Sequence, residues 1–73
     1  MVTTQTCVYD SSTIEASTYT YKTKELFVTF KHATYLYSNV NVEDYEQFRN
    51  AESQGRALNQ FIKKYSYQKL EEQ

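Results

Sequence analysis

The chain has 73 residues, a net charge of −1, one cysteine, one glycine and eight tyrosines, and it has no proline or tryptophan. This length allows one small domain and excludes a two-domain enzyme, and the composition excludes a transmembrane span, a disulfide scaffold and a Pro-rich linker. The near-neutral balance also lacks the basic excess of a dedicated duplex-binding protein.

The first predicted strand covers roughly residues 13–21. Its larger apolar side chains fall at both even and odd positions: Ile14, Ala16, Tyr19 and Tyr21. An ideal strand would place them on opposite faces. A bulge near Ser17 would bring all four to one face.

Two more strands follow, joined by a short connection at residues 31–33. Within residues 25–31, one face carries Leu26, Val28 and Phe30. Phe27 points to the opposite face, which is therefore not wholly polar. Residues 34–37 place Tyr35 and Tyr37 on a common face, and a tight hairpin is the simplest geometry for this pair of strands.

Two helices are predicted after residue 40. Asn41 is a candidate N-cap for the first, and its apolar stripe consists of Val42, Tyr45, Phe48 and Ala51. Ser53 is the candidate cap of the second, and its stripe consists of Leu58, Phe61, Ile62 and Tyr65. Residues 66–73 continue no apolar face and are expected to fray.

Strands followed by helices predict an α+β fold, with a three-stranded antiparallel β-sheet followed by two α-helices packed on one face. The expected domain covers residues 11–65, between an N-terminal extension of residues 1–10 and a C-terminal tail of residues 66–73. Leu, Ile, Val and Phe number only 15, so tyrosines are expected to supply part of the core. A single cysteine and no apolar leader predict a cytoplasmic location.

The chain lacks the side chains that catalysis or metal binding usually needs. A metal site takes three or four ligands, and the chain offers one histidine, His32, and one cysteine, Cys7, far apart in sequence. His32 falls in the predicted hairpin connection, where side chains are usually solvated. We therefore predict no enzyme activity, no metal and no cofactor.

The aromatic strands are one candidate binding site. Tyr35 and Tyr37, together with Tyr19 and Tyr21, could line a sheet face that stacks nucleic-acid bases. Three lysines nearby could contact phosphates: Lys22, Lys24 and Lys31. The alternative is that these rings are core, replacing scarce Leu and Ile.

The start of the second helix is the other candidate. Ser53, Gly55, Arg56 and Asn59 lie in its first turns, and Lys63 follows one turn later on the same side. Free amides and a positive dipole end can hold a phosphate or carboxylate there. The alternative is a simple helix-helix turn, in which Ser53 caps and Gly55 permits tight packing against the sheet.

Over about residues 11–65 the chain resembles the KTSC domain family. The matching positions are Ser11, Ser12, Ile14, Tyr19, Leu26, Val28, Phe30, Tyr35, Tyr37, Val40, Tyr45, Phe48, Ala51, Ser53, Gly55, Leu58, Asn59, Ile62 and Tyr65. It departs from the family in two turns: residues 31–34 lack the usual glycine, and Asn41 stands where the family tends to have proline. The family takes its name from the carboxyl end of some lysyl-tRNA synthetases, and its members include free-standing small bacterial and phage proteins.

The resemblance implies a small non-catalytic binding module, with RNA as the candidate partner because of the synthetase association. The alternative is a protein-protein interaction module, such as a phage-encoded inhibitor or accessory factor acting on a host protein. Its motivation is the small near-neutral chain and the apolar Phe27. A homodimer is a further option, and no membrane partner is expected.

Overall fold

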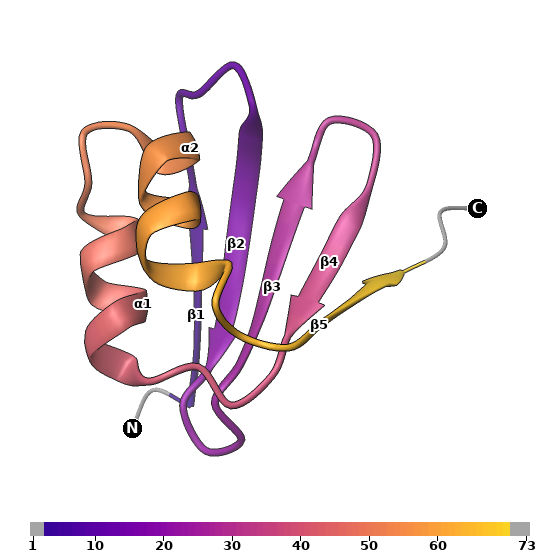
Figure 1. The fold of residues 1–73 in the computed structure, drawn as a ribbon, viewed down its shortest axis with the longest axis vertical. Coiled ribbons are helices and arrows are strands. Elements are labelled where there is room, and N and C mark those ends of the chain that lie inside the picture. The colour runs from indigo at the N-terminus through magenta and orange to yellow at the C-terminus, as the bar shows by residue number, and fades with distance from the viewer. Residues whose placement is uncertain (1–2, 71–73) are drawn as a thin grey trace.

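Within residues 3–70, the part of the chain that the computed structural model describes, five strands pair in their sequence order and every pairing is antiparallel. The strands are β1 (Thr4–Val8), β2 (Ile14–Thr20), β3 (Glu25–Phe30), β4 (Thr34–Tyr37) and β5 (Tyr67–Leu70). The helices lie between β4 and β5 in the sequence and cover one face of the sheet (Figure 1).

The α+β class, the antiparallel sheet and the two helices are confirmed, but the expected number of strands is wrong. The additional strands, β1 and β5, come from the segments expected to be an extension and a tail. Both lie at the edges of the sheet, where backbone hydrogen bonds to one neighbour hold them. Neither edge strand needs a strongly apolar side-chain pattern in order to pair with its neighbour. Residues 71–73, the remainder of the expected tail, lie outside the described residues.

A β-bulge corrects the side-chain alternation of β2. The register with β3 shifts between Ile14, opposite Phe30, and Ala16, opposite Thr29. The bulge therefore lies two residues before the predicted position. It places Ile14 and Tyr19 on the helix-covered face, and both are fully buried. Ala16 faces the other way, so the prediction that it shares their face is wrong.

The helices begin as predicted and end differently. α1 (Val42–Arg49) starts after Asn41, although the Asn41 side chain makes no capping hydrogen bond. α2 (Gln54–Ala57) starts after Ser53, whose hydroxyl accepts a hydrogen bond from the Arg56 amide. α2 continues into the π-helical turn η1 (Leu58–Ile62), so the second helix stops before Tyr65. No helix in residues 3–70 is long and apolar enough to cross a membrane.

Tyrosines fill the core beneath the helices. The Tyr19 ring stacks on the Tyr45 ring of α1, with centroids 4.2 Å apart and planes 11° apart. Both rings are fully buried, and the Tyr19 hydroxyl donates a hydrogen bond to the Val40 carbonyl oxygen at 2.5 Å. Burial raises the pKa of both tyrosines. Tyr19 is therefore a core residue and cannot stack on a base. The sequence alone had left both roles open.

The opposite face of the sheet carries no helix in residues 3–70 (Figure 1). Cross-strand register places Phe27 there between Thr18 and Leu36. Among residues 3–70, the paired residues on this face are Thr4, Thr6, Val8, Ala16, Thr18, Thr20, Glu25, Phe27, Thr29, Thr34, Leu36, Gln68 and Leu70. Within this set, only Glu25 is charged.

Candidate ligand-binding groove

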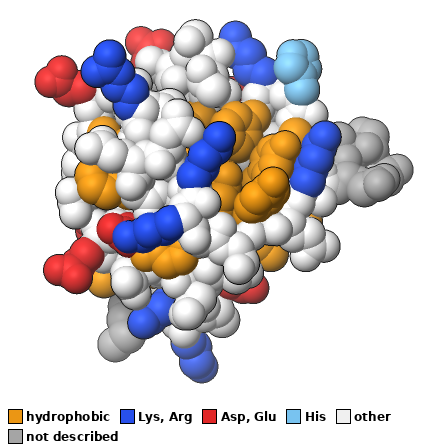
Figure 2. All heavy atoms as spheres, in the orientation of Figure 1, with side chains coloured by type: hydrophobic (Ala, Val, Ile, Leu, Met, Phe, Trp, Pro, Cys, Tyr) orange, Lys and Arg blue, Asp and Glu red, His pale blue; other side chains and the backbone are white. Residues whose placement is uncertain are grey.

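A groove of about 1100 Å³ lies where the helices cease to cover the sheet. One wall comes from α2 and η1, the floor comes from β3 and β4, and the other wall is β5. Figure 2 shows hydrophobic side chains gathered in this hollow, with Lys or Arg side chains on either side. The groove exists because α2 and η1 pack over the first strands, while β4 and β5 extend beyond them (Figure 1).

Four aromatic rings form the floor. Phe30 and Tyr35 meet edge to face with centroids 5.3 Å apart, and Tyr35 and Tyr67 lie 5.5 Å apart at an angle of 47°. Tyr67 also lies 5.7 Å from the ring of Tyr37. Cross-strand pairing places these rings next to one another, because Tyr37 of β4 is directly opposite Tyr67 of β5.

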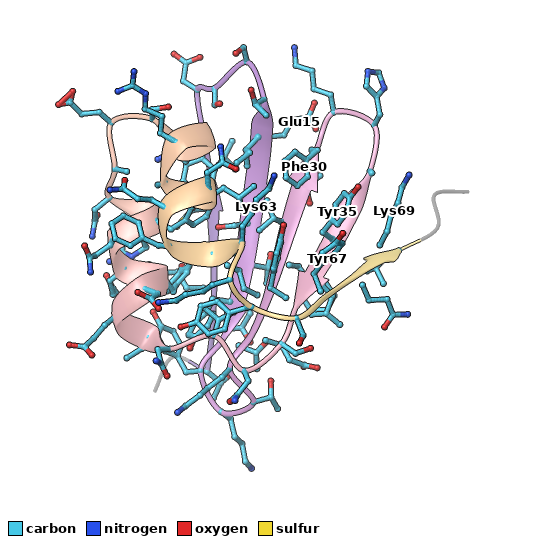
Figure 3. The ribbon with its side chains drawn as sticks, viewed as in Figure 1. Glu15, Phe30, Tyr35, Lys63, Tyr67 and Lys69 are labelled. Carbon is cyan, nitrogen blue, oxygen red and sulfur yellow. The ribbon has the colours of Figure 1, made fainter. Side chains whose placement is uncertain are left out.

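The charged side chains that line the groove are basic. They are Lys31, Arg56, Lys63 and Lys69, half of the chain's 8 Lys and Arg residues. Among residues 3–70, no Asp or Glu belongs to the lining. Figure 3 shows Lys63 and Lys69 on opposite sides of the rings, with Glu15 of the β2 bulge near Phe30 at one end. The described lining therefore carries four basic side chains although the chain has a net charge of −1.

The groove brings together the two segments that the sequence offered as separate candidates. Tyr35, Tyr37, Gly55, Arg56, Asn59 and Lys63 all line it. Ser53 does not, because its hydroxyl is turned to the Arg56 amide as a helix cap. Sequence separation hid this meeting, since β4 and the second helix are adjacent only in the tertiary structure.

The two tyrosines of β4 are not equivalent. Tyr37 is 3% exposed and belongs to the core, and burial raises the pKa of its hydroxyl. Tyr35 is half-buried and packs against the core from the groove side. Tyr35 can thus meet a ligand with its ring, whereas Tyr37 mainly supports the floor.

Gly55 is not needed for packing. It does not have a positive φ, and a Cβ added to it would meet Thr13 Oγ1 at 4.0 Å, an ordinary van der Waals distance. The interpretation that Gly55 permits tight packing against the sheet is therefore wrong. Its lack of a side chain leaves space on the groove side of the helix.

Of the lysines near the aromatic strands, only Lys31 lines the groove. Lys22 and Lys24 lie in the turn between β2 and β3, at the opposite end of β3 from Lys31, and neither belongs to the lining. Their exposure on a distant turn makes them unsuited to contact a ligand held in the groove. Lys22 is consequently a natural control for charge-removal experiments.

Sequence reasoning missed Phe30, Tyr67 and Lys69 as groove residues. The sequence pattern places Phe30 on the same strand face as Leu26 and Val28 and gives it no role in binding. Tyr67 and Lys69 lie in the segment expected to fray. The segment carries no strand alternation, because its apolar residues, Tyr67 and Leu70, lie on opposite faces of the sheet.

A polar cluster below the groove holds the chain where it leaves the second helix. The Tyr65 hydroxyl donates a hydrogen bond to Asp44 and accepts one from the Asn41 amide, and Lys64 Nζ lies 3.1 Å from Asp44 Oδ2. The Tyr65 hydrogen bond lowers the pKa of Asp44, with Lys64 adding to the effect. Asp44, in the first turn of α1, therefore fixes the segment that leads into β5.

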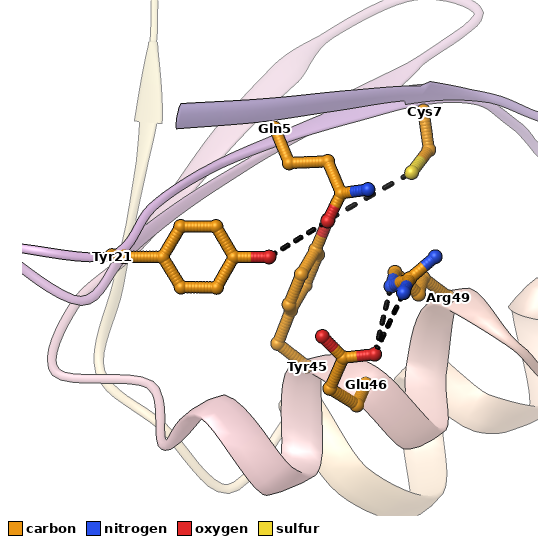
Figure 4. Close-up of polar contacts among 6 residues, drawn as sticks. All are labelled: Gln5, Cys7, Tyr21, Tyr45, Glu46 and Arg49. Carbon is orange, nitrogen blue, oxygen red and sulfur yellow. Dashed lines mark hydrogen bonds and ion pairs between the residues drawn. The ribbon is translucent and has the colours of Figure 1, made fainter. Parts of the chain in front are cut away.

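Cys7 belongs to a second polar cluster, between β1 and α1 (Figure 4). Its Sγ lies 3.7 Å from the Tyr45 hydroxyl, and the hydroxyls of Tyr45 and Tyr21 both donate to Gln5 Oε1, at 3.3 and 2.7 Å. This network ties the polar strand β1 to α1 by side-chain hydrogen bonds, in addition to its backbone pairing with β2. Within residues 3–70, no three His, Cys, Asp or Glu side chains gather as metal ligands would.

Comparisons with known proteins give the family. The model of the KTSC domain matches residues 10–67. The crystal structure of the KTSC domain protein YPO2434 from Yersinia pestis matches with a TM-score of 0.85 and 28% sequence identity, over 93% of this chain and 99% of that chain. The comparison with curated proteins found no match. The matched span and the shared fold show that the chain belongs to the KTSC domain family.

Proposed function

We propose that this protein is a non-catalytic binding module and that its groove binds RNA. The observation that carries the proposal is the composition of the groove, in which an aromatic floor lies between basic side chains and, within the part of the chain that the structure describes, no carboxylate contributes to the lining. Aromatic rings stack on bases of any sequence, and Lys and Arg neutralise phosphates. The net charge of −1 does not oppose this, because a local positive patch governs contacts at close range.

The test is fluorescence anisotropy of a labelled single-stranded RNA titrated with protein. We expect micromolar affinity that falls between about 50 and about 200 mM salt, since cations displaced from phosphates drive the binding. Lys63→Gln should weaken binding several-fold and reduce the slope of log affinity against log salt by about 0.7, the value for one phosphate on a single strand.

Lys22→Gln is the matched control, because it removes the same charge from the distant β2–β3 turn. It should leave the affinity within about twofold of the unmodified protein, since screening over a Debye length of ~10 Å weakens remote charges. Equal losses in Lys63→Gln and Lys22→Gln would show that binding is diffuse and not localised in the groove. No binding at about 100 µM protein, the weak limit of electrostatic association, would end the proposal.

The second candidate function is protein recognition through the open face of the sheet. Phe27 and Leu36 lie side by side on this face, and Val8 at its edge is 84% exposed. A nearly uncharged face of this kind fits a protein surface better than a polyanion. If a host protein binds there, Phe27→Glu should abolish its capture and leave RNA affinity unchanged, whereas Lys63→Gln should do the reverse.

A further inference from the structure

We infer that the groove accepts an unpaired strand of about three nucleotides, with its bases on the aromatic floor and its phosphates at the basic rims. This inference rests on the proposed function, because it specifies the form of RNA that the groove can hold. It follows from the geometry of the rings, from the position of the cations and from the size of the hollow.

The rings are too close together to enclose a base. Stacked bases need a spacing of ~3.4 Å on each side. The centroids of Phe30, Tyr35 and Tyr67 follow one another at 5.3 and 5.5 Å, and the planes are inclined by 74° and 47°. No base can therefore enter between neighbouring rings. Bases must lie on the groove side of the rings, and Tyr67 offers the most accessible ring, at 62% exposure.

The length of the floor limits the number of bases. Two successive centroid steps of 5.3 and 5.5 Å separate Phe30 from Tyr67. A single strand with splayed bases places one base on each ring, so the rings of Phe30, Tyr35 and Tyr67 accommodate about three bases. The groove volume of about 1100 Å³ lies just above the usual range for small-molecule sites and is small for a longer polymer.

The cations are placed for the backbone of such a strand. Lys63 and Lys69 rise from opposite walls, on either side of the rings (Figure 3). Lys31 lies at the hairpin between β3 and β4, at the end of the groove where Phe30 stands. All three lysines are exposed, so their ammonium groups can reach phosphates at the rim while bases occupy the floor.

A duplex cannot use this arrangement. In a helix, each base face is covered by its stacked neighbours, and side chains read single strands by stacking on splayed bases. The whole molecule measures only 30 × 29 × 24 Å, so its groove cannot surround a duplex. A duplex would contact the rim lysines alone and lose the stacking contribution.

The experiment measures affinity for oligouridines of increasing length and for a blunt RNA duplex, at one low salt concentration. We expect affinity to rise at least about tenfold from one to three nucleotides, since each further base adds a stacking contact with a ring. Beyond three nucleotides it should change only about twofold for each doubling of length. The duplex should bind at least about tenfold more weakly than a single strand of equal length.

Tyr67→Ala tests the floor directly. Tyr67 lies in the edge strand and is mostly exposed, so the fold should survive its truncation, which circular dichroism checks. The variant should lose about tenfold in trinucleotide affinity, and Tyr67→Phe should retain it because stacking needs the ring alone. Unchanged affinity in Tyr67→Ala, or a duplex bound as tightly as a single strand, would overturn this inference and leave the proposal of RNA binding intact. Failure of every RNA to bind would overturn both.

Discussion

Two tyrosines separated by one residue have different physical roles. Tyr37 lies under the second helix at 3% exposure, whereas Tyr35, two residues earlier on the same face, lies in the groove. The difference comes from the limit of the helical cover and not from the residue type. Substitutions at these positions should therefore separate stability from binding.

We expect Tyr37→Ala to destabilise the fold by about 3–5 kcal/mol, the usual cost of truncating a buried aromatic side chain. The total free energy of unfolding of a domain of this size is little more than that, so the variant should be largely unfolded. Tyr35→Ala should cost about 1–2 kcal/mol, because its ring is only half-buried. Urea denaturation followed by circular dichroism measures both. Equal losses would show that Tyr35 is as much a core residue as Tyr37.

At the scale of secondary-structure elements, β5 is the wall on which the groove depends. It pairs with β4 alone, and it carries Tyr67 and Lys69 into the groove. The segment before it is held by the contact between Tyr65 and Asp44 and by a backbone hydrogen bond of 3.0 Å from the Ser38 amide to the Ser66 carbonyl oxygen. A polar contact with α1 thus positions one side of a binding surface.

The Asp44 contact predicts a loss of stability in acid. Because folding lowers the pKa of Asp44, its ionised form stabilises the protein above the unfolded pKa of ~3.9. That contribution disappears as pH falls through the lower pKa of the folded state. Asp44→Asn should cost about 1 kcal/mol near neutral pH and flatten the decline below about pH 4. Urea denaturation at several pH values measures this.

Tyr65→Phe is the companion variant, because it removes only the hydroxyl that donates to Asp44. In the double variant the two losses should be less than additive, since both substitutions break the same contact. Full additivity, or an unchanged acid profile in Asp44→Asn, would show that the contact contributes nothing to stability.

For the whole molecule, the tyrosines that replace aliphatic core residues make stability sensitive to alkali. Burial raises the pKa of Tyr9 to about 12, and it also raises the pKa of Tyr19, Tyr37 and Tyr45. In the unfolded chain these hydroxyls ionise near pH 10. Their contribution to stability is therefore complete below about pH 10 and is lost as pH rises toward the folded-state values.

We expect the protein to unfold cooperatively between about pH 10 and about pH 12. Each tyrosine whose pKa is raised by folding should lower the free energy of unfolding by up to ~1.4 kcal/mol per pH unit. Tyrosinate absorbance and circular dichroism, recorded together, measure this. The absorbance change of these four tyrosines, half of the chain's eight, should coincide with the loss of structure, whereas the protein in concentrated urea should titrate near pH 10. Ionisation of these tyrosines near pH 10, before the protein unfolds, would contradict the burial of their hydroxyls.

Charge is also segregated across the molecule. Acidic residues gather on α1, at Glu43, Asp44 and Glu46, while half of the basic residues line the groove at the other side of the second helix. A net charge of −1 therefore describes neither surface. Total charge is a weak guide to partners in a chain whose ionised groups the fold sorts into separate faces.

Local pattern was sufficient for the elements that bury a regular apolar face. The alternation of Leu26 and Val28 predicted β3, the spacing of Tyr45 and Phe48 predicted α1, and Ser53 marked the start of the second helix. These signals are local, because each depends on which residues of one strand or helix turn inward together. The fold class followed from the order of such elements.

Only the tertiary structure decided the edge strands and the groove. β1 and β5 join the sheet through backbone hydrogen bonds to one neighbour, and such bonds leave little trace in side-chain type. The meeting of Tyr35, Lys63 and Lys69 depends on strand register and on where the π-helical turn η1 ends, and both are set by packing between distant segments. The sequence by itself therefore determined only part of the candidate site, and long-range packing added Phe30, Tyr67 and Lys69 and joined all of these residues into one surface.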